Sequence, residues 1–407
     1  MTKAGLGFIV AGVFVYFLAS QTQIGWLYLF DALIWGLLVM SAIMTWLNIR
    51  SLRVERQVLL PVSTLHQSQL DSPSEDEAVE VKLKVTNRGR LTRHFIKVLE
   101  DCPFDQPEAR HRAFFLASIN PQSTTAFSYT ATCYRRGYYT SASTTLQSSG
   151  PLGLTVRRRT FPLPLNLTVY PAYYQVEGIP AANQAWADQG HAVRSSAAAE
   201  FYGSREYRYG DPLKHIHWRN TARLGNFMLK EFEQSSQGQV SVVLETGRDF
   251  GVGKETTLEY GIKIAASLAR LGADSGYGID IITGKTALYN AGWREAMDYL
   301  ARLDVGGEVT LAELAAAPAM TQVCVAVVPA VETRLISILA QLADRASGLV
   351  VMLLEGFAQD EKPREFTAGL QGKNIEIISC TRGNLEAAIR KLSKTLVFGS
   401  RLSARIG

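Results

Sequence analysis

Two long apolar runs stand at the start of the chain, and no later stretch is comparable. Residues 4–20 carry no charged side chain, and residues 24–47 carry a single one, Asp31. As helices they extend about 25 and 36 Å, which brackets a hydrocarbon core of about 30 Å. Because only three polar residues separate the runs, the pattern favours a transmembrane helical hairpin over a cleavable signal peptide. Asp31 is either a functional acid or one near the outer interface, reaching water or a neighbouring helix, and we favour the second interpretation.

Basic residues flank this hairpin at its two outer ends. Lys3 precedes the first run, and Arg50, Arg53 and Arg56 follow the second, whereas the short connecting loop has no charge. The positive-inside rule then places both ends of the hairpin in the cytoplasm. The rest of the chain is expected there as well. Its four scattered cysteines, which show neither a disulfide framework nor a zinc spacing, agree with a reducing compartment.

Residues 54–171 show the two-residue period of β-strands. Polar and apolar positions alternate in residues 80–85 and again in residues 127–133, and an Asn-Arg-Gly turn follows the first of these strands. Helical periodicity is not evident in this region. Several short strands with proline and glycine between them predict an all-β, sandwich-like domain. The acidic stretch at residues 71–77 is expected to be a solvated loop.

After residue 239 the pattern changes to strands that alternate with helices. Apolar, buried-type strands are predicted at residues 240–244, 277–283, 323–328, 349–354 and 375–379, and helices at residues 256–271, 293–303, 331–345 and 384–396. A short strand at residues 287–289 is expected to turn back on the second of these strands as an antiparallel hairpin. This alternation predicts an α/β, doubly wound, mostly parallel sheet.

Charge is distributed unevenly along the 407 residues. Lysine and arginine total 42 and aspartate and glutamate 37, a net charge of +5 that excludes a dedicated polycationic nucleic-acid binder. Residues 194–230 carry seven basic and three acidic side chains, so 7 − 3 = +4 of that charge lies there. The mean hydropathy of +0.03 averages a membrane anchor with an ordinary cytoplasmic body. Everything outside the anchor flank and this segment is close to neutral.

The segment at residues 190–235 interleaves charged and aromatic residues too densely for a plain linker. Its sequence resembles the family called domain of unknown function 58, whose pattern runs G-E-F, R-x-Y-x-x-G-D, I-D-W, A-R and then a strand ending in F-E. The chain departs from the pattern at Ala199 and His217. The positions that match or accompany it are Glu200, Phe201, Arg205, Tyr207, Gly210, Asp211, Trp218, Arg219, Arg223, Lys230 and Glu233.

The resemblance extends upstream, to Arg-Gly-Tyr at residues 136–138, Pro-Leu-Gly-Leu at residues 151–154 and Tyr-Pro at residues 170–171. It implies a protein of a bacterial or archaeal cell membrane whose C-terminal part is similar to a von Willebrand factor A domain. It also implies a protein partner of the MoxR-type AAA+ ATPase class. The chain is thus expected to comprise two spans at residues 1–50, a β-sandwich-like domain at 54–171, the motif segment at 190–235 and a von Willebrand A-like domain at 238–400.

A von Willebrand A domain often binds Mg²⁺ through D-x-S-x-S after its first strand, because one carboxylate and two hydroxyls suit a hard cation. The corresponding positions here are Glu245, Gly247 and Asp249. Gly247 offers no ligand atom, and Arg248 beside it adds a repelling charge. We therefore expect a degenerate metal site, with no bound Mg²⁺ and no other cofactor. His215 and His217 form an H-x-H pair, for which a structural role is favoured over zinc binding.

Three functions compete on these observations. The favoured one is a non-catalytic, membrane-anchored adaptor in which Arg205, Asp211 and Trp218 are buried and hydrogen-bonded to one another. The alternative is an enzyme with a site between the two soluble domains around Glu200, Asp211 and His217. No P-loop and no nucleophile elbow is present in the sequence. Binding of nucleic acid by the +4 segment is the least favoured, so we expect no nucleic-acid partner.

Overall fold

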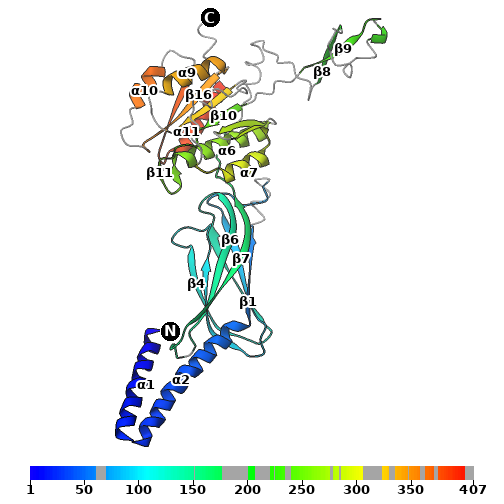
Figure 1. The fold of residues 1–407 in the computed structure, drawn as a ribbon. Helices are drawn as coiled ribbons and strands as arrows, with labels where there is room; N and C mark the ends of the chain where they lie inside the picture. The colour runs from blue at the N-terminus through cyan, green and yellow to red at the C-terminus, as the bar shows by residue number, and fades with distance from the viewer. Residues whose placement is uncertain are drawn as a thin grey trace. The chain divides into compact units, whose positions relative to one another are not determined.

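The computed structural model describes residues 1–60, 70–150, 152–176, 200–206, 221–223, 225–233, 240–275, 278–283, 286–305, 323–329, 335–346, 348–357, 363–370 and 375–398. The chain divides into two units, Met1–Ala172 and Tyr173–Gly407. The first contains the apolar helices and an antiparallel β-domain, and the second contains an α/β sheet (Figure 1). Each unit is described by itself.

The two N-terminal helices are α1 (Lys3–Thr22) and α2 (Gly25–Arg50). Both are long and apolar enough to cross a membrane by length and composition, so the predicted pair of helices is confirmed. Residues spaced by seven are buried along each helix: Gly5, Gly12 and Ala19 on α1, and Asp31, Leu38 and Thr45 on α2. A Cβ atom at Gly12 would lie 3.2 Å from the indole nitrogen of Trp35, so this glycine leaves room for a side chain of α2. Asp31 thus belongs to the buried stripe of α2 and is 9% exposed.

The β-domain follows α2 without a break and consists of two antiparallel sheets. The sheet β1-β2-β5 pairs Leu52–Leu59, Ala78–Asn87 and Thr124–Thr132. The sheet β4-β3-β6-β7 pairs His111–Ile119, Arg93–Asp101, Gly137–Ser148 and Arg157–Val169. Apolar residues from both sheets form one core cluster. The alternating strands predicted at residues 80–85 and 127–133 are confirmed as parts of β2 and β5.

The acidic stretch at residues 71–77 contradicts the expectation of a solvated loop, because residues 73–75 are buried. Glu75 is 4% exposed. Its Oε1 atom accepts a hydrogen bond of 2.9 Å from the backbone N–H of Arg136 at the start of β6. The prediction was wrong because a buried backbone donor needs an acceptor, and a carboxylate from this stretch supplies it.

A buried ion pair joins the two sheets through the core of the β-domain. The guanidinium of Arg56 on β1 contacts the carboxylate of Glu100 on β3, and the two side chains are 2% and 0% exposed. Tyr129 on β5 donates to Glu100 Oε1 at 3.2 Å, and Thr144 on β6 donates to Oε2 at 2.5 Å. Burial raises the pKa of Glu100 above its usual value, although Arg56 and these hydrogen bonds act in the opposite direction. The carboxylate of Glu100 on β3 therefore contacts side chains from three other strands.

The C-terminal unit contains a six-stranded sheet in the order β14-β13-β10-β15-β16-β17. Its strands are Ala287–Ala291, Ile279–Thr283, Val240–Leu244, Val323–Val328, Gly348–Glu355 and Ile375–Thr381. Neighbouring strands are parallel except at the edge, where β14 runs antiparallel to β13. The antiparallel edge hairpin and the mostly parallel sheet are as predicted.

The helices of this unit are α6 (Thr257–Ser275), α7 (Trp293–Arg302), α9 (Leu335–Arg345), α10 (Pro363–Leu370) and α11 (Leu385–Phe398). The glycine at position 272 does not end α6, as its type had suggested, because that part of the helix is buried and packing outweighs the glycine penalty of about 1 kcal/mol. A small hairpin, β11 (Gly251–Val252) with β12 (Glu255–Thr256), precedes α6.

Part of the motif segment forms a separate antiparallel pair. β8 (Glu200–Glu206) pairs with β9 (Met228–Glu233), and the register places Glu200 opposite Glu233 and Phe201 opposite Phe232. The strand predicted to end in Phe-Glu is confirmed. The two ends of the motif, about 30 residues apart in sequence, are therefore brought together by backbone pairing.

Candidate functional site

The carboxyl edge of the six-stranded sheet is the natural place for a site in the C-terminal unit. Strand order reverses between β10 and β15, and doubly wound sheets bind ligands at the carboxyl ends of the strands beside such a reversal. The loop that leaves β10 begins at Glu245 and leads through the β11–β12 hairpin into α6. This loop also contains the three positions of the predicted degenerate metal site.

Glu245, the first of these positions, is neutralised by its own loop. Its carboxylate is 3% exposed, and Oε1 lies 2.8 Å from Nε of Arg248. The other oxygen, Oε2, is buried and has no hydrogen-bond partner. A buried carboxylate requires a cation or hydrogen-bond donors, and the guanidinium provides both. Arg248 therefore pairs with the carboxylate that would otherwise face a metal ion, rather than merely repelling one.

Asp249, the third position, is used by the helix that follows. Its Oδ1 atom accepts a hydrogen bond of 2.9 Å from the backbone N–H of Leu258 and lies 3.2 Å from the hydroxyl of Thr257. A carboxylate at the start of α6 satisfies an unpaired backbone N–H and faces the positive end of the helix dipole. Gly247, between the two acids, contributes no side-chain ligand. Within the described residues, no three histidine, cysteine, aspartate or glutamate side chains are placed to hold a metal ion.

Tyr260 on α6 contacts residues of three other segments, at Glu255, Phe357 and Gly383. Its hydroxyl donates to Glu255 Oε2 at 2.6 Å and accepts the backbone N–H of Gly383 at 2.8 Å. Its ring packs edge-to-face on Phe357, with 5.0 Å between ring centres. Burial, followed by the bond to Glu255, raises the pKa of Tyr260 to about 12, so the hydroxyl stays protonated at neutral pH. This role could not be predicted from the sequence, which shows only an aromatic residue on an amphipathic helix.

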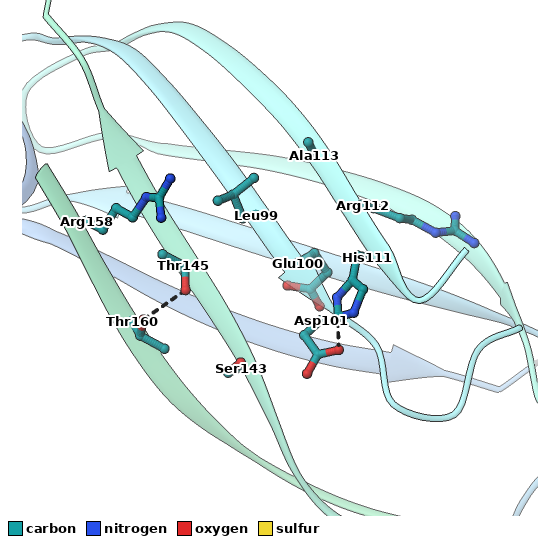
Figure 2. Close-up of a pocket in the computed structure, with 10 residues that line it drawn as sticks. All are labelled: Leu99, Glu100, Asp101, His111, Arg112, Ala113, Ser143, Thr145, Arg158 and Thr160. Atoms are coloured by element: carbon teal, nitrogen blue, oxygen red, sulfur yellow. Dashed lines mark hydrogen bonds and ion pairs between the residues drawn. The ribbon is translucent and has the colours of Figure 1, made fainter. Parts of the chain in front are cut away.

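A hollow of about 450 Å³ lies on the β-domain, and Figure 2 shows the residues that line it. Its two carboxylates and Arg112 are already paired, and the carboxylate of Glu100 contacts Arg56. Asp101 is paired with Arg110 at 3.0 Å and with His111 at 3.4 Å, and Arg112 contacts Asp105 at 2.5 Å. The hollow was not foreseen, because its lining residues come from four strands that only register brings together: Leu99, Glu100, Asp101, His111, Arg112, Ala113, Ser143, Thr145, Arg158 and Thr160.

Some of the predicted motif residues lie in described strands. Glu200, Phe201 and Arg205 lie on β8, and Lys230 and Glu233 lie on β9. The positions outside the described residues are Tyr207, Gly210, Asp211, His215, His217, Trp218 and Arg219, and Arg223 lies in a short helical turn, where it is exposed. The predicted contact between Arg205, Asp211 and Trp218 stays a prediction, as does the alternative catalytic cluster.

Comparison with protein families gives one match, which falls on the segment just described. Residues 203–303 match the family described as protein of unknown function DUF58. The predicted resemblance to DUF58 is confirmed. The matched residues begin inside β8 and end just after α7, so they include β9, the carboxyl-edge loop and the β13–β14 hairpin. No curated protein matches the chain.

Solved structures give distant likenesses. The VWA domain of SpRpn10 aligns at 10% identity and a TM-score of 0.28, over 38% of this chain and 94% of that domain. A GH20 exo-β-N-acetylglucosaminidase from Vibrio harveyi, in complex with N-acetylglucosamine, aligns at 9% identity and a TM-score of 0.20, over 84% of this chain and 59% of the enzyme. Likenesses at these scores do not bear on function.

Proposed function

We propose that the chain is a non-catalytic adaptor anchored in a bacterial or archaeal cell membrane by α1 and α2, with both ends in the cytoplasm. In this proposal the β-domain is a β-sandwich and the α/β unit is a von Willebrand A-like domain, with the domain limits expected from the sequence. The strand order of the α/β unit and its antiparallel edge strand β14 support the second assignment. The uncharged loop between the helices and the basic flank after α2 support the orientation.

The observation that supports the adaptor function most is that both acids of the carboxyl edge already have partners within the protein. Glu245 is paired with Arg248, and Asp249 holds the start of α6. A catalytic or metal-binding acid at this edge needs a carboxylate free to meet a substrate or an ion. Here both acids stabilise the loop instead, so the edge is a fixed surface suited to protein contacts.

We infer a partner surface at the tip of the β11–β12 hairpin. Val252 beside this tip is 77% exposed, although valine favours burial, and the hairpin follows the loop that leaves β10 at the carboxyl edge. The proposed partner is an AAA+ ATPase of the MoxR type, which the DUF58 resemblance implies. The chain shows no nucleotide-binding motif of its own, so an ATPase partner would supply the energy-using step.

Capture of the full chain from detergent-extracted membranes, with identification of bound proteins by mass spectrometry, tests this function. We expect an AAA+ ATPase in the sample, and Val252→Asp should abolish its capture while leaving the melting temperature unchanged. Val305→Asp is the matched control, because Val305 is also exposed and lies elsewhere in the same unit. Recovery of the chain alone, or equal capture by both variants, would contradict the proposal.

A further inference from the structure

The turn between β6 and β7 fastens the first span to the β-domain. The hydroxyl of Thr2 lies 2.7 and 3.0 Å from the backbone oxygens of Gly153 and Leu154, to which it donates. The same hydroxyl accepts the backbone N–H of Gly5 and so caps α1. A Cβ atom at Gly5 would lie 2.1 Å from the oxygen of Leu154, so the helix and the turn are in direct backbone contact. The Pro-Leu-Gly-Leu sequence noted earlier thus provides an attachment point.

The second span is attached at the same end of the β-domain. Thr155, the next residue of the turn, is hydrogen-bonded to Ser41 at 2.9 Å and to Thr45 at 3.2 Å. One turn further along α2, the side chain of Asn48 donates to the backbone oxygen of His94 and to the hydroxyl of Ser148, both at 3.1 Å. Polar contacts therefore hold the last three turns of α2 against the β-domain.

This attachment fixes the height of the β6–β7 turn relative to a membrane. α1 begins beside the turn, and its 20 residues extend about 30 Å, the thickness of a hydrocarbon core. The turn therefore lies where the hydrocarbon ends and the headgroups begin. The part of α2 that continues past Ser41 rises through the headgroup layer, because nine further residues add about 13 Å.

Apolar side chains at this end of the β-domain face outward. Leu152, at the tip of the turn, is 49% exposed. Phe95 follows the residue bonded to Asn48, and its ring lies 6.4 Å from that of Phe115; both rings are exposed. Trp46 on α2 is also exposed and stacks with the guanidinium of Arg50 at 4.6 Å. Exposed aromatic and aliphatic groups of this kind are typical of protein surfaces at the membrane interface.

Arginines from a distant part of the sequence reach the same level. Residues Arg157–Arg159 open β7 directly after the turn and are all exposed. Arg159 donates to the backbone oxygen of Arg50 at 3.2 Å, and Arg158 donates to the side chain of Gln147. In the described parts of the chain, Arg50 and Arg157–Arg159 form no ion pair with a carboxylate. Their charge is therefore available to anions at the membrane surface.

We propose that this end of the β-domain is a docking surface for anionic phospholipids, with Leu152 inserted below the headgroups and Arg50 and Arg157–Arg159 placed over the phosphates. The proposal rests on the membrane anchoring proposed above and adds the lipid class to it. Basic residues close to an anionic membrane surface attract its lipids, by about fivefold for each residue. The surface would hold the β-domain at a fixed height.

A fluorophore on Leu152→Cys in the full chain, reconstituted in lipid nanodiscs, tests the insertion. The four native cysteines are buried, so the label reports one site. Glu108→Cys is the control, because its exposed turn follows β3, whose nine residues place it roughly 30 Å from the helix-bearing end. We expect acyl-chain spin labels to quench the Leu152 label several times more than the Glu108 label. Equal quenching at the two sites would overturn the insertion.

Energy transfer from the same label to trace fluorescent phosphatidylglycerol, compared with phosphatidylcholine, tests the choice of lipid. We expect several-fold enrichment of phosphatidylglycerol, and a fall of that enrichment to near unity in the triple variant Arg157→Gln, Arg158→Gln and Arg159→Gln. Arg110→Gln, at the far end of the domain, should keep the preference. No enrichment in the unsubstituted chain would overturn the headgroup assignment. Failure of the chain to enter nanodiscs at all would instead overturn the proposed anchoring itself.

Discussion

Replacing Arg56 by methionine should lower the free energy of unfolding of the β-domain by more than its position on a short strand suggests. The substitution keeps most of the side-chain volume but leaves the carboxylate of Glu100 buried without its cation. Two hydroxyl donors, from Tyr129 and Thr144, remain in contact with that carboxylate. Breaking a buried pair by removing one partner costs about 3–5 kcal/mol. Because the two hydroxyls remain, we expect a loss near 3 kcal/mol, which raises the unfolded population roughly 100-fold.

The buried thiols of the chain provide an assay that reports each unit separately. None of the six tryptophans lies in residues 51–172, so tryptophan fluorescence does not observe the β-domain directly. Burial raises the pKa of Cys133 in the β-domain, and of Cys324 and Cys380 in the α/β unit, to about 12. These thiols therefore react with an alkylating reagent only when their unit opens. In the Arg56→Met chain, Cys133 should label about 100-fold faster, while Cys324 and Cys380 keep their rates.

The pH dependence of this effect has a definite sign. Burial already raises the pKa of Glu100 in the folded chain, and loss of Arg56 removes an influence that lowers it. The folded variant then favours the protonated form of Glu100. This protonation contributes fully to folding stability below the unfolded pKa, and the contribution is lost as the pH rises through the folded pKa. The labelling ratio of variant to unsubstituted chain should therefore grow as the pH rises above the unfolded pKa of glutamate, about 4.3.

Arg53→Met, an exposed position on the same strand, is the matched control and should change stability by less than about 0.5 kcal/mol. The double variant with Glu100→Gln should recover much of the loss, because no unpaired charge then stays buried. A ratio near one for Arg56→Met, or no change of that ratio with pH, would show that water reaches Glu100 and would refute the reasoning.

Three further substitutions test other contacts by the same labelling assay. Gly5→Leu should destabilise the N-terminal unit by about 1–3 kcal/mol because its side chain meets a backbone carbonyl, whereas Gly7→Leu, with open space around it, should be neutral. Arg248→Ala should cost about 1–3 kcal/mol, and Mg²⁺ should restore part of this loss in the variant alone by neutralising Glu245; equal Mg²⁺ effects in both chains would contradict the assignment. Tyr260→Phe should cost about 1–2 kcal/mol through two lost hydrogen bonds, and an unchanged labelling rate in the α/β unit would contradict that role.

The α/β sheet was the part most open to prediction from sequence. Its parallel strands are covered on both faces, so each is a nearly continuous apolar run that differs clearly from the helices between them, as residues 240–244 and 323–328 show. The edge hairpin followed from a Gly-Lys pair between two short strands. The order of the six strands could not be obtained in this way, because a period identifies a strand but not its neighbours.

The β-domain was predicted as a class rather than strand by strand. β3 and β4 were not predicted as strands, and for β3 one reason is Phe95, whose φ of +56° interrupts the extended backbone and the alternation of buried and exposed positions. Charged residues were the least predictable. Glu75, Arg56 and Glu100 were expected at the surface or not considered, because charge normally indicates exposure. Their burial depends on partners that lie 44 and 61 residues away in sequence and become visible only in the folded chain.

The two units place an arginine against a buried carboxylate in comparable ways, and this bears on the candidate site. In the β-domain, Arg56 and Glu100 join two sheets; at the carboxyl edge, Arg248 and Glu245 hold a loop. An arginine side chain is always present beside its carboxylate because it belongs to the same chain. A metal ion occupies such a site only when enough of it is dissolved. Under the proposed function, the loop geometry beside β10 would not depend on the divalent-ion concentration. A partner that docks on this edge would then encounter the same surface with or without divalent ions, which suits a constitutive adaptor better than an ion-dependent receptor.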